Sequence, residues 1–245
     1  MIEGINTFWI DGEAASGYGI IMTEPPKIQS AERDVEQISI PGRNGDLQID
    51  NGRYKNIHMT YKCALLPEYG DFRRDAVAAL RFLRSTGAYR RVEDTYYPGH
   101  FRMARISSGV SIGSIAEQAG EFEVHWDCKP ERYTVAGEKA QTFRAPAVLH
   151  NQYGFPALPI IKIYGSGNGF IKIGAVKIPI RGMVDNIILD CDLQKAFRLR
   201  PDGTPEPADS HIYAPYFPQL LGGGNAISWA GGVDHVEITP RWWTL

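Results

Sequence analysis

The chain has 245 residues, of which 43% are hydrophobic and 22% are charged, so it can bury one large core or two modest ones. Its formal net charge of −2 at pH 7 provides no overall positive field, which argues against tight non-specific binding to nucleic acid. No apolar run approaches the roughly 18 residues that cross a bilayer, and the first residues lack the basic and apolar regions of a signal peptide. We therefore expect no membrane insertion, and synthesis and folding in the cytoplasm.

The first clear pattern along the chain is a β-hairpin. Residues 35–40 alternate apolar and polar side chains, and an apolar-polar-apolar run follows at residues 47–49. Between them lie the pairs Pro41-Gly42 and Asn44-Gly45, which form turns because Gly and Asn accept positive φ at low cost. The sequence therefore predicts a hairpin with an exposed tip at residues 41–46.

A strand at residues 57–65 precedes the one convincing helix, predicted over residues 71–85. Helical spacing places five apolar residues on one stripe: Phe72, Ala76, Ala79, Leu80 and Leu83. Asp71 suits the N-cap of this helix and Gly87 suits its C-cap. The arginines of the helix lie outside the stripe, at Arg73, Arg74, Arg81 and Arg84. They form either a solvated face or a subunit contact.

Two further strands, at residues 101–106 and 120–128, complete the first half of the chain. The second alternates large apolar side chains with Glu121, Glu123, His125 and Asp127, so we expect one packed face and one polar face. The pattern then weakens into a polar stretch at residues 134–146. We place a domain boundary there, between an N-terminal domain of residues 1–140 and a C-terminal domain of residues 147–245.

The second half is again rich in strands. Strands are expected at residues 158–164, 170–173, 175–180, 187–193, 196–199 and 233–238, with a turn at 165–169 and a Pro-rich loop at 200–218. About a hundred residues with strands at this spacing favour a β-sandwich. The predicted fold class is therefore mainly β, with one α-helix in the N-terminal domain.

One segment matches a catalytic pattern. Residues 109–113 read G-x-S-x-G around Ser111, the nucleophile elbow of α/β-hydrolases. That elbow needs a strand, a strained turn and a helix in succession, and too few residues follow Ser111 for a helix before the next strand. We interpret the segment as a hairpin connection.

Other residue types with chemical potential are not grouped as a site would require. The carboxylate pairs Glu121/Glu123 and Asp190/Asp192 each fall on one strand face and are interpreted as solvated residues. The histidines are scattered, and the three cysteines, Cys63, Cys128 and Cys191, have no metal-ligand or CxxC spacing. The cysteines and most of the tryptophans are interpreted as core residues. We predict no catalytic residue, no cofactor site and no metal site.

Several segments, in order along nearly the whole chain, resemble the distal tail proteins of siphophages and related prophages. In the first half they are the Pro-Gly-Arg-x-Gly hairpin in residues 40–49, the single helix with residues 80–87, and a strand ending in Cys-x-Pro-x-x-Tyr over residues 122–133. In the second half they are Asn151 with residues 154–168, followed by residues 216–220, 224–227 and 236–243. Their order and spacing carry the resemblance.

This resemblance implies an N-terminal ring-forming β domain with one helix and a C-terminal galectin-like β-sandwich. The protein would form a hexameric ring at the phage tail tip, in the virion, after synthesis in the cytoplasm of the host bacterium. The implied partners are copies of itself, the tail tube protein, the tape measure protein and tail hub, fibre or receptor-binding proteins. DNA would pass through the ring without specific binding, so a lumen dense in Lys and Arg would hinder it.

A ring requires two different, complementary patches on each subunit. We expect two groups of residues to contribute to them. The first is the hairpin tip, formed by Pro41, Gly42, Arg43, Asn44, Gly45 and Asp46. The second is the arginine side of the helix, formed by Arg73, Arg74, Arg81 and Arg84.

Two other functions stay open. The second domain could act as a carbohydrate-binding module for bacterial surface glycans, although the His-x-Asn-x-Arg pattern of galactoside-binding galectins is absent from the sequence. An enzyme, either a serine esterase around Ser111 or a glycosidase, is the third alternative.

Overall fold

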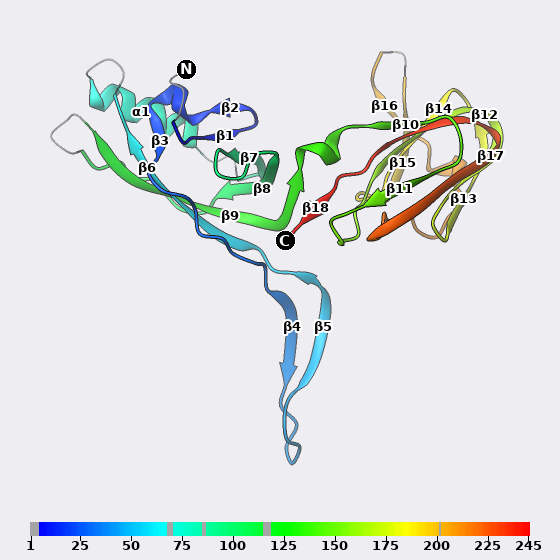
Figure 1. Ribbon diagram of the computed structural model, residues 1–245, viewed down its shortest axis with the longest axis horizontal. Coiled ribbons are helices and arrows are strands. Elements are labelled where there is room, and N and C mark those ends of the chain that lie inside the picture. The colour runs from blue at the N-terminus through cyan, green and yellow to red at the C-terminus, as the bar shows by residue number, and fades with distance from the viewer. Residues whose placement is uncertain (1–4, 68–70, 85–86, 115–118, 201) are drawn as a thin grey trace. The chain divides into compact units, whose positions relative to one another are not determined.

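The protein is described from a computed structural model that covers residues 5–67, 71–84, 87–114, 119–200 and 202–245. The chain divides into two compact units (Figure 1). Unit 1 comprises Met1–Arg132 with Leu245, and unit 2 comprises Tyr133–Thr244. The domain boundaries expected at residues 140 and 147 stay a prediction.

Unit 1 is built on one antiparallel sheet with the order β2-β1-β7-β8-β9-β6-β3. Its strands are β1 (Phe8–Ile10), β2 (Glu13–Ala14), β3 (Ile20–Met22), β6 (Ile57–Leu65), β7 (Arg90–Asp94), β8 (His100–Ile106) and β9 (Gly120–Thr134), and a 3-10 helix, η1, spans Ala15–Tyr18. Strand β6 begins and ends where the sequence predicted. Its alternate side chains, from Ile57 to Leu65, are buried, because strand residues two apart share one face of a sheet.

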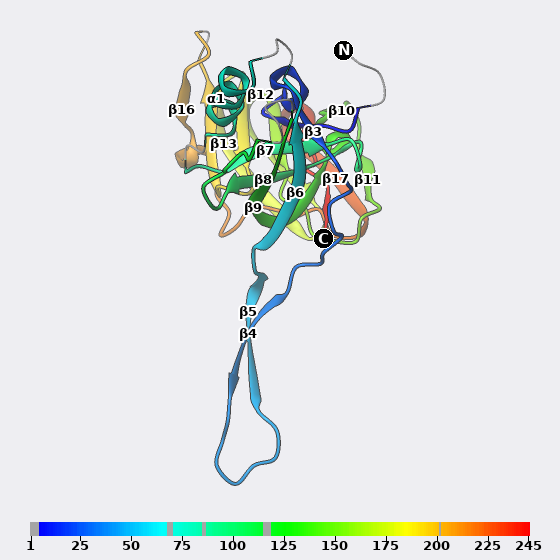
Figure 2. The same ribbon diagram turned by 90° about the vertical axis from the view of Figure 1, so that its left-hand side faces the viewer.

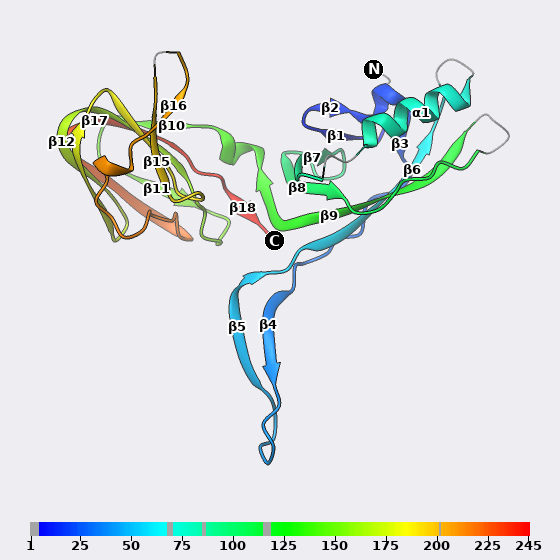
Figure 3. The same ribbon diagram turned by 180° about the vertical axis from the view of Figure 1, so that it is seen from behind.

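Helix α1 (Phe72–Leu83) packs against this sheet (Figure 3). Asp71 caps its N-terminus as expected, since the carboxylate accepts the backbone N–H of Arg74 at 3.1 Å. The predicted C-cap at Gly87 is wrong, because the helix ends at Leu83 and Arg84 is its C-cap. The expected extension to Ser85 lies outside the described residues.

The apolar stripe of α1 also differs from the prediction at one position. Phe82 is buried and Leu80 is 37% exposed. The Phe82 ring stacks on Tyr18 of η1 at a centroid distance of 4.6 Å. This aromatic contact turns the buried face of the helix toward Phe82, which spacing alone could not indicate.

Two strands of unit 1, β4 (Arg33–Ile38) and β5 (Leu47–Tyr54), form a separate two-stranded sheet. Figure 2 shows them side by side, with the connecting loop at their far end. The hairpin predicted from the sequence is therefore confirmed.

Unit 2 contains β10 (Gln141–Phe143), β11 (Ala147–Asn151), β12 (Ile160–Ile173), β13 (Val176–Met183), β14 (Asn186–Asp190), β15 (Lys195–Leu199), β16 (Pro205–Pro207), β17 (Gly223–Thr239) and β18 (Trp243–Thr244). Two 3-10 helices accompany them, η2 (Val135–Glu138) and η3 (Asp209–His211). The predicted Pro-rich loop at 200–218 therefore includes a short strand and a helical turn. Strands β12 and β17 pair along most of their length.

The two halves of β12 have different second neighbours, β14 for residues 160–164 and β13 for residues 167–173. Side chains of both halves, Ile161 and Ile163 from one and Ile171 and Ile173 from the other, belong to one buried core. The strands thus fold over into two layers, and the predicted β-sandwich is confirmed. With one α-helix in the described part of the chain, the mainly β class is confirmed as well.

The turn predicted at residues 165–169 is wrong, because β12 continues through it with shifts in register. The glycines there serve close backbone packing between β12 and β17. A Cβ at Gly232 would lie 1.7 Å from the Ser166 carbonyl oxygen, and one at Gly165 would lie 2.0 Å from that of Gly232. Only glycine fits at such distances.

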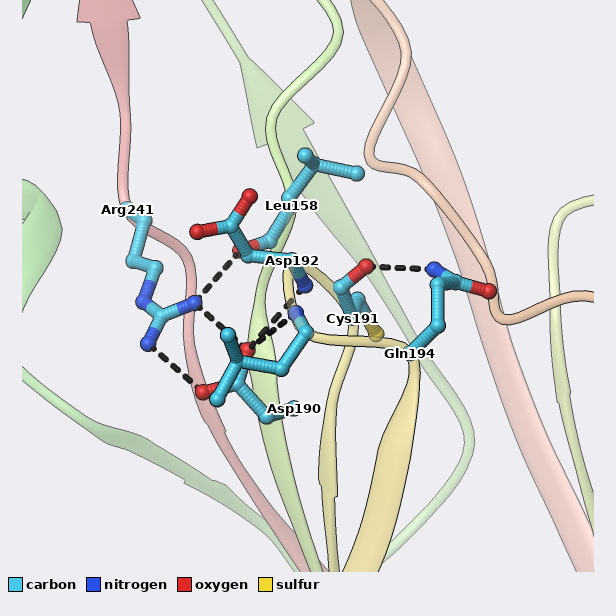
Figure 4. A network of polar contacts seen from close by, with 7 residues as sticks. Leu158, Asp190, Cys191, Asp192, Gln194 and Arg241 are labelled. Carbon is cyan, nitrogen blue, oxygen red and sulfur yellow. Dashed lines mark hydrogen bonds and ion pairs between the residues drawn. The ribbon is translucent and has the colours of Figure 1, made fainter.

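An ion pair fixes the turn after β14 (Figure 4). The Arg241 guanidinium donates to both carboxylate oxygens of Asp190, at 2.9 and 3.0 Å. Asp190 also accepts the backbone N–H groups of Asp192 and Leu193. Burial alone raises the pKa of Asp190, but the hydrogen bonds, that of Arg241 first among them, outweigh burial and lower it.

The three cysteines are free and buried, as interpreted from the sequence. Burial raises the pKa of each thiol, at Cys63, Cys128 and Cys191, to about 12. They therefore remain protonated at neutral pH and act as small apolar residues. Among the described residues, no helix is long and apolar enough to span a membrane.

Candidate assembly surface

The tip of the β4–β5 hairpin is a tight turn. The Arg43 backbone N–H donates to the Ile40 carbonyl oxygen at 3.1 Å, and Gly42 has a φ of 80°. A type II turn favours Pro at its second position and requires positive φ at its third, which Pro41 and Gly42 satisfy. All residues from Pro41 to Asp46 are exposed, so the tip is shaped and accessible as predicted.

The base of the hairpin is held by ion pairs between its two sides. They are Arg33–Asp50 at 2.9 Å, Arg53–Asp34 at 2.7 Å and Lys55–Glu32 at 3.8 Å. The Arg33 guanidinium also lies over the Tyr54 ring, at 4.9 Å. The backbone N–H of Gly52, and then Arg33, lower the pKa of Asp50. Because all of these groups except Asp34 are exposed, each pair is individually weak, and together they hold the two sides in register.

The outer half of the hairpin exposes aliphatic side chains on one face. Ile38 pairs with Leu47 across the strands, and Ile49 pairs with Glu36, so these four side chains share a face. Ile38, Leu47 and Ile49 are 38%, 40% and 43% exposed. In the described part of the chain, the hairpin pairs with no further strand. An apolar face on an isolated two-stranded hairpin is typical of a surface that a partner covers.

The second predicted group lies on helix α1 and its C-cap. Its four members are exposed, with Arg73, Arg74 and Arg81 in the helix and Arg84 as the C-cap. Arg81 and Arg84 line an open hollow that Tyr18 and Arg90 also line. The other two belong to the first turn of the helix. The predicted contact residues therefore lie on two elements, the β4–β5 hairpin and α1, and their role stays a prediction.

The hydrolase-like segment has no elbow geometry. Ser111 is exposed in the connection between β8 and β9, which are neighbours in the sheet of unit 1. The described residues after it lead into β9 and not into a helix. The interpretation as a hairpin connection is confirmed for those residues, whereas residues 115–118 lie outside them.

The carboxylate pairs do not form a paired-acid site. Glu121 and Glu123 are exposed on β9 as expected. Asp190 and Asp192 do not share a strand face, because β14 ends at Asp190 and Asp192 lies in the following turn. No group of three potential metal ligands occurs among the described residues.

The sequence matches no family model, and no curated protein sequence is similar to it. Solved structures do resemble it. The structure of the SPP1 Dit (gp 19.1) protein superposes with a TM-score of 0.74 at 12% sequence identity, over 96% of this chain and 97% of that one. It is described as a paradigm of the hub adsorption apparatus in Gram-positive infecting phages.

The chain has the fold of a phage Dit protein. The likeness extends over nearly the whole length of both chains, so it includes both units. The resemblance to siphophage distal tail proteins inferred from the sequence is therefore confirmed at the level of the fold.

One polar cluster of this Dit-like fold was not predicted. Asp127 was expected on the polar face of β9, but it is 5% exposed. It accepts hydrogen bonds from Asn56 at 2.8 Å, Tyr89 at 3.2 Å and Arg105 at 2.9 Å. Burial alone raises the pKa of Asp127, but these hydrogen bonds outweigh burial and lower it. An alternating pattern gives no signal for such burial, since the partners come from three other segments.

Proposed function

We propose that this protein is a structural subunit of a phage tail tip, a distal tail protein that assembles with copies of itself into a hexameric ring. The observation that carries the proposal is the likeness to the SPP1 Dit protein over 96% of the chain. At 12% identity this likeness concerns the fold. The β4–β5 hairpin adds a reason specific to this chain, because its aliphatic face is uncovered.

In this proposal the hairpin supplies one of the two complementary patches that a ring needs. The neighbouring subunit covers Ile38, Leu47 and Ile49, while the polar tip around Arg43 fixes the register of the contact. The arginine side of α1 supplies further contacts. Burying exposed apolar area drives the association, and the charged groups select the correct partner.

The ring joins the tail tube to the hub or host-adsorption apparatus. Its partners are the tail tube protein, the tape measure protein and the tail hub, fibre or receptor-binding proteins, and its location is the tail tip of the virion. DNA passes through the ring during ejection. The net charge of −2 suits a conduit that does not hold its cargo.

The first test is the mass of the purified full chain by light scattering after size exclusion, with negative-stain images of the same peak. A ring gives six times the subunit mass of 27.3 kDa and a closed outline. A monomer at all concentrations, with no ring when the tail tube protein is added, contradicts the proposal.

A second candidate is glycan binding by unit 2, because two tyrosines there are exposed. Tyr213 and Tyr216 are 49% and 60% exposed, and aromatic rings stack on sugars. The Arg181 guanidinium already lies over the Tyr213 ring at 4.5 Å, which favours Tyr216 as the stacking residue. Saturable binding of the full chain on a bacterial glycan array, lost in Tyr216→Ala, would establish this function. Absence of saturable binding would eliminate it.

A further inference from the structure

Unit 1 contains a small cavity of about 30 Å³ between its sheet and residues 27–29. Its lining includes apolar side chains, among them Met59, Val92 and Phe101. The lining also contains three strongly basic residues, Lys27, Arg102 and Arg132. A cavity of this size holds one or two water molecules, or the head of one small anion.

The Arg102 guanidinium is buried without a carboxylate partner. The residue is 9% exposed, and its Nη1 donates to the Pro130 carbonyl oxygen at 2.9 Å. Among the described residues, it makes no ion pair. Arg90 and Arg105 of the same unit do pair, with Asp11 at 2.7 Å and with Asp127 at 2.9 Å. Burial, and next the charge of Arg132, lower the pKa of Arg102, as expected for a cation that lacks compensation.

Arg132 contains a buried donor without a partner. Its Nη2 donates to the main-chain oxygen of Leu245 at 2.8 Å, and its guanidinium lies 5.2 Å from the centroid of the Tyr97 ring. Its Nε, however, is buried and has no hydrogen-bond partner in the described part of the chain. Leaving a buried charged donor unsatisfied is costly, so this Nε, in a residue that lines the same cavity as the buried Arg102, indicates a missing acceptor.

The carboxylate found among the described lining residues does not supply that acceptor. Asp94 accepts the Tyr61 hydroxyl at 2.8 Å and the backbone N–H groups of Tyr96 and Tyr97 at 2.9 and 3.0 Å. These bonds hold the turn after β7. Asp94 makes no ion pair with Arg102 or Arg132 within 4.0 Å, so the cavity retains an excess of positive charge.

We propose that this cavity binds a single carboxylate group, with the guanidinium groups of Arg102 and Arg132 as hydrogen-bond donors and Lys27 at the mouth. The planar guanidinium matches a carboxylate, and the volume suits its few atoms better than a phosphate. Ile28, which lines the cavity and is 80% exposed, offers apolar contact to the carbon attached to the carboxylate. The site does not depend on whether the chain forms a ring.

The test is thermal unfolding of the full chain in sodium formate and in sodium chloride at equal ionic strength and pH. Formate produces a saturable rise in Tm that chloride does not, because only a carboxylate matches the planar guanidinium groups of Arg102 and Arg132. Arg102→Gln raises the apparent Kd for formate by roughly tenfold or more. The matched control, Arg43→Gln at the exposed hairpin tip, leaves that Kd unchanged.

Lys27→Gln keeps the experiment decisive if Arg102→Gln fails to fold, since Lys27 is exposed and makes no ion pair among the described residues. It raises the Kd for formate a few-fold. Equal Tm values in formate and chloride overturn the proposal. An apparent Kd for formate that neither Lys27→Gln nor Arg102→Gln changes also overturns it. Inorganic phosphate that stabilises as well as formate overturns the assignment to a carboxylate.

The same samples distinguish two sources of the carboxylate. If an acidic side chain of another copy occupies the cavity, saturating formate lowers the light-scattering mass and chloride does not. If the ligand is a free small carboxylate, formate raises Tm with no change in mass. Both results support a carboxylate site, and they assign its occupant.

Discussion

The β4–β5 hairpin and the β12–β17 region of unit 2 are both built from antiparallel strands with isoleucines at alternate positions. In unit 2 these side chains face a second layer, and Ile163 and Ile171 are fully buried. On the hairpin, Ile38 and Ile49 are 38% and 43% exposed. An alternating pattern specifies a strand with an apolar face, but it does not specify whether the cover for that face comes from the same chain.

Fold stability and assembly depend on different regions of the molecule. The core of unit 2 is complete within the chain, so its residues stabilise the fold directly. The aliphatic face of the hairpin contributes little until a partner covers it. Substitutions in the core of unit 2 should therefore lower the free energy of unfolding, whereas substitutions on the hairpin should weaken assembly.

Replacement of Ile171 by Ala should lower the free energy of unfolding by about 3 to 4 kcal/mol, because the side chain is 0% exposed and its loss leaves a cavity. Ile49→Ala on the hairpin should lower it by less than about 0.5 kcal/mol. Denaturant titration of both variants as monomers measures the difference. Similar losses would contradict the distinction between the two regions.

Arg241→Gln should lower the free energy of unfolding at pH 7 by about 2 kcal/mol, since it leaves the covered Asp190 carboxylate with backbone partners alone. Arg53→Gln, which breaks a hairpin ion pair whose arginine is exposed, should cost less than about 0.5 kcal/mol. Denaturant titrations at low and high salt check both, and only the hairpin pair should be salt-sensitive. A larger loss of unfolding free energy in Arg53→Gln than in Arg241→Gln would contradict this prediction.

The Asp190 pair also predicts a dependence on pH. Its folded-state pKa is lowered, so its contribution to stability is fully present above the unfolded-state pKa and is lost as pH falls through the folded value. The difference in stability between the wild type and Arg241→Gln should shrink in acid. A difference that stays constant from pH 7 into the acid range would exclude this linkage.

The smallest effects on unfolding, and the largest on assembly, should come from the hairpin. Leu47→Ser should change monomer stability by less than about 0.5 kcal/mol but raise the dissociation constant of the assembly by about tenfold or more. Gln48→Ser, on the opposite face of the same strand, is the matched control. Charge reversal at the tip, Arg43→Glu, should also weaken assembly. Unchanged mass and ring shape in both Leu47→Ser and Arg43→Glu would remove the hairpin from the interface.

Local sequence patterns predicted most elements of the fold. The strand from Ile57 to Leu65, the hairpin and the N-cap at Asp71 were predictable, because alternation, turn residues and capping are local properties. The glycines around Gly165 predict a turn, yet β12 continues through them. Glycine permits both a turn and a close approach of two strands, and only the partner strand distinguishes them.

The candidate sites also differ in whether the sequence predicts them. The hairpin tip is recognisable from Pro41 and Gly42 alone. The buried Asp127 and the unpaired Arg102 are not, since both depend on groups brought together from distant segments. A missing partner is a property of three-dimensional packing, and no spacing along the chain signals it.

The ion pairs at the base of the hairpin have a consequence for the kinetics of association. Arg33–Asp50 and Arg53–Asp34 hold the two strands in one register before any partner arrives. A preformed element loses less conformational entropy on docking than a segment that must fold as it binds. The hairpin therefore does not have to become ordered before a partner binds. Salt that weakens these ion pairs should lower the association rate at concentrations that leave the assembled ring stable.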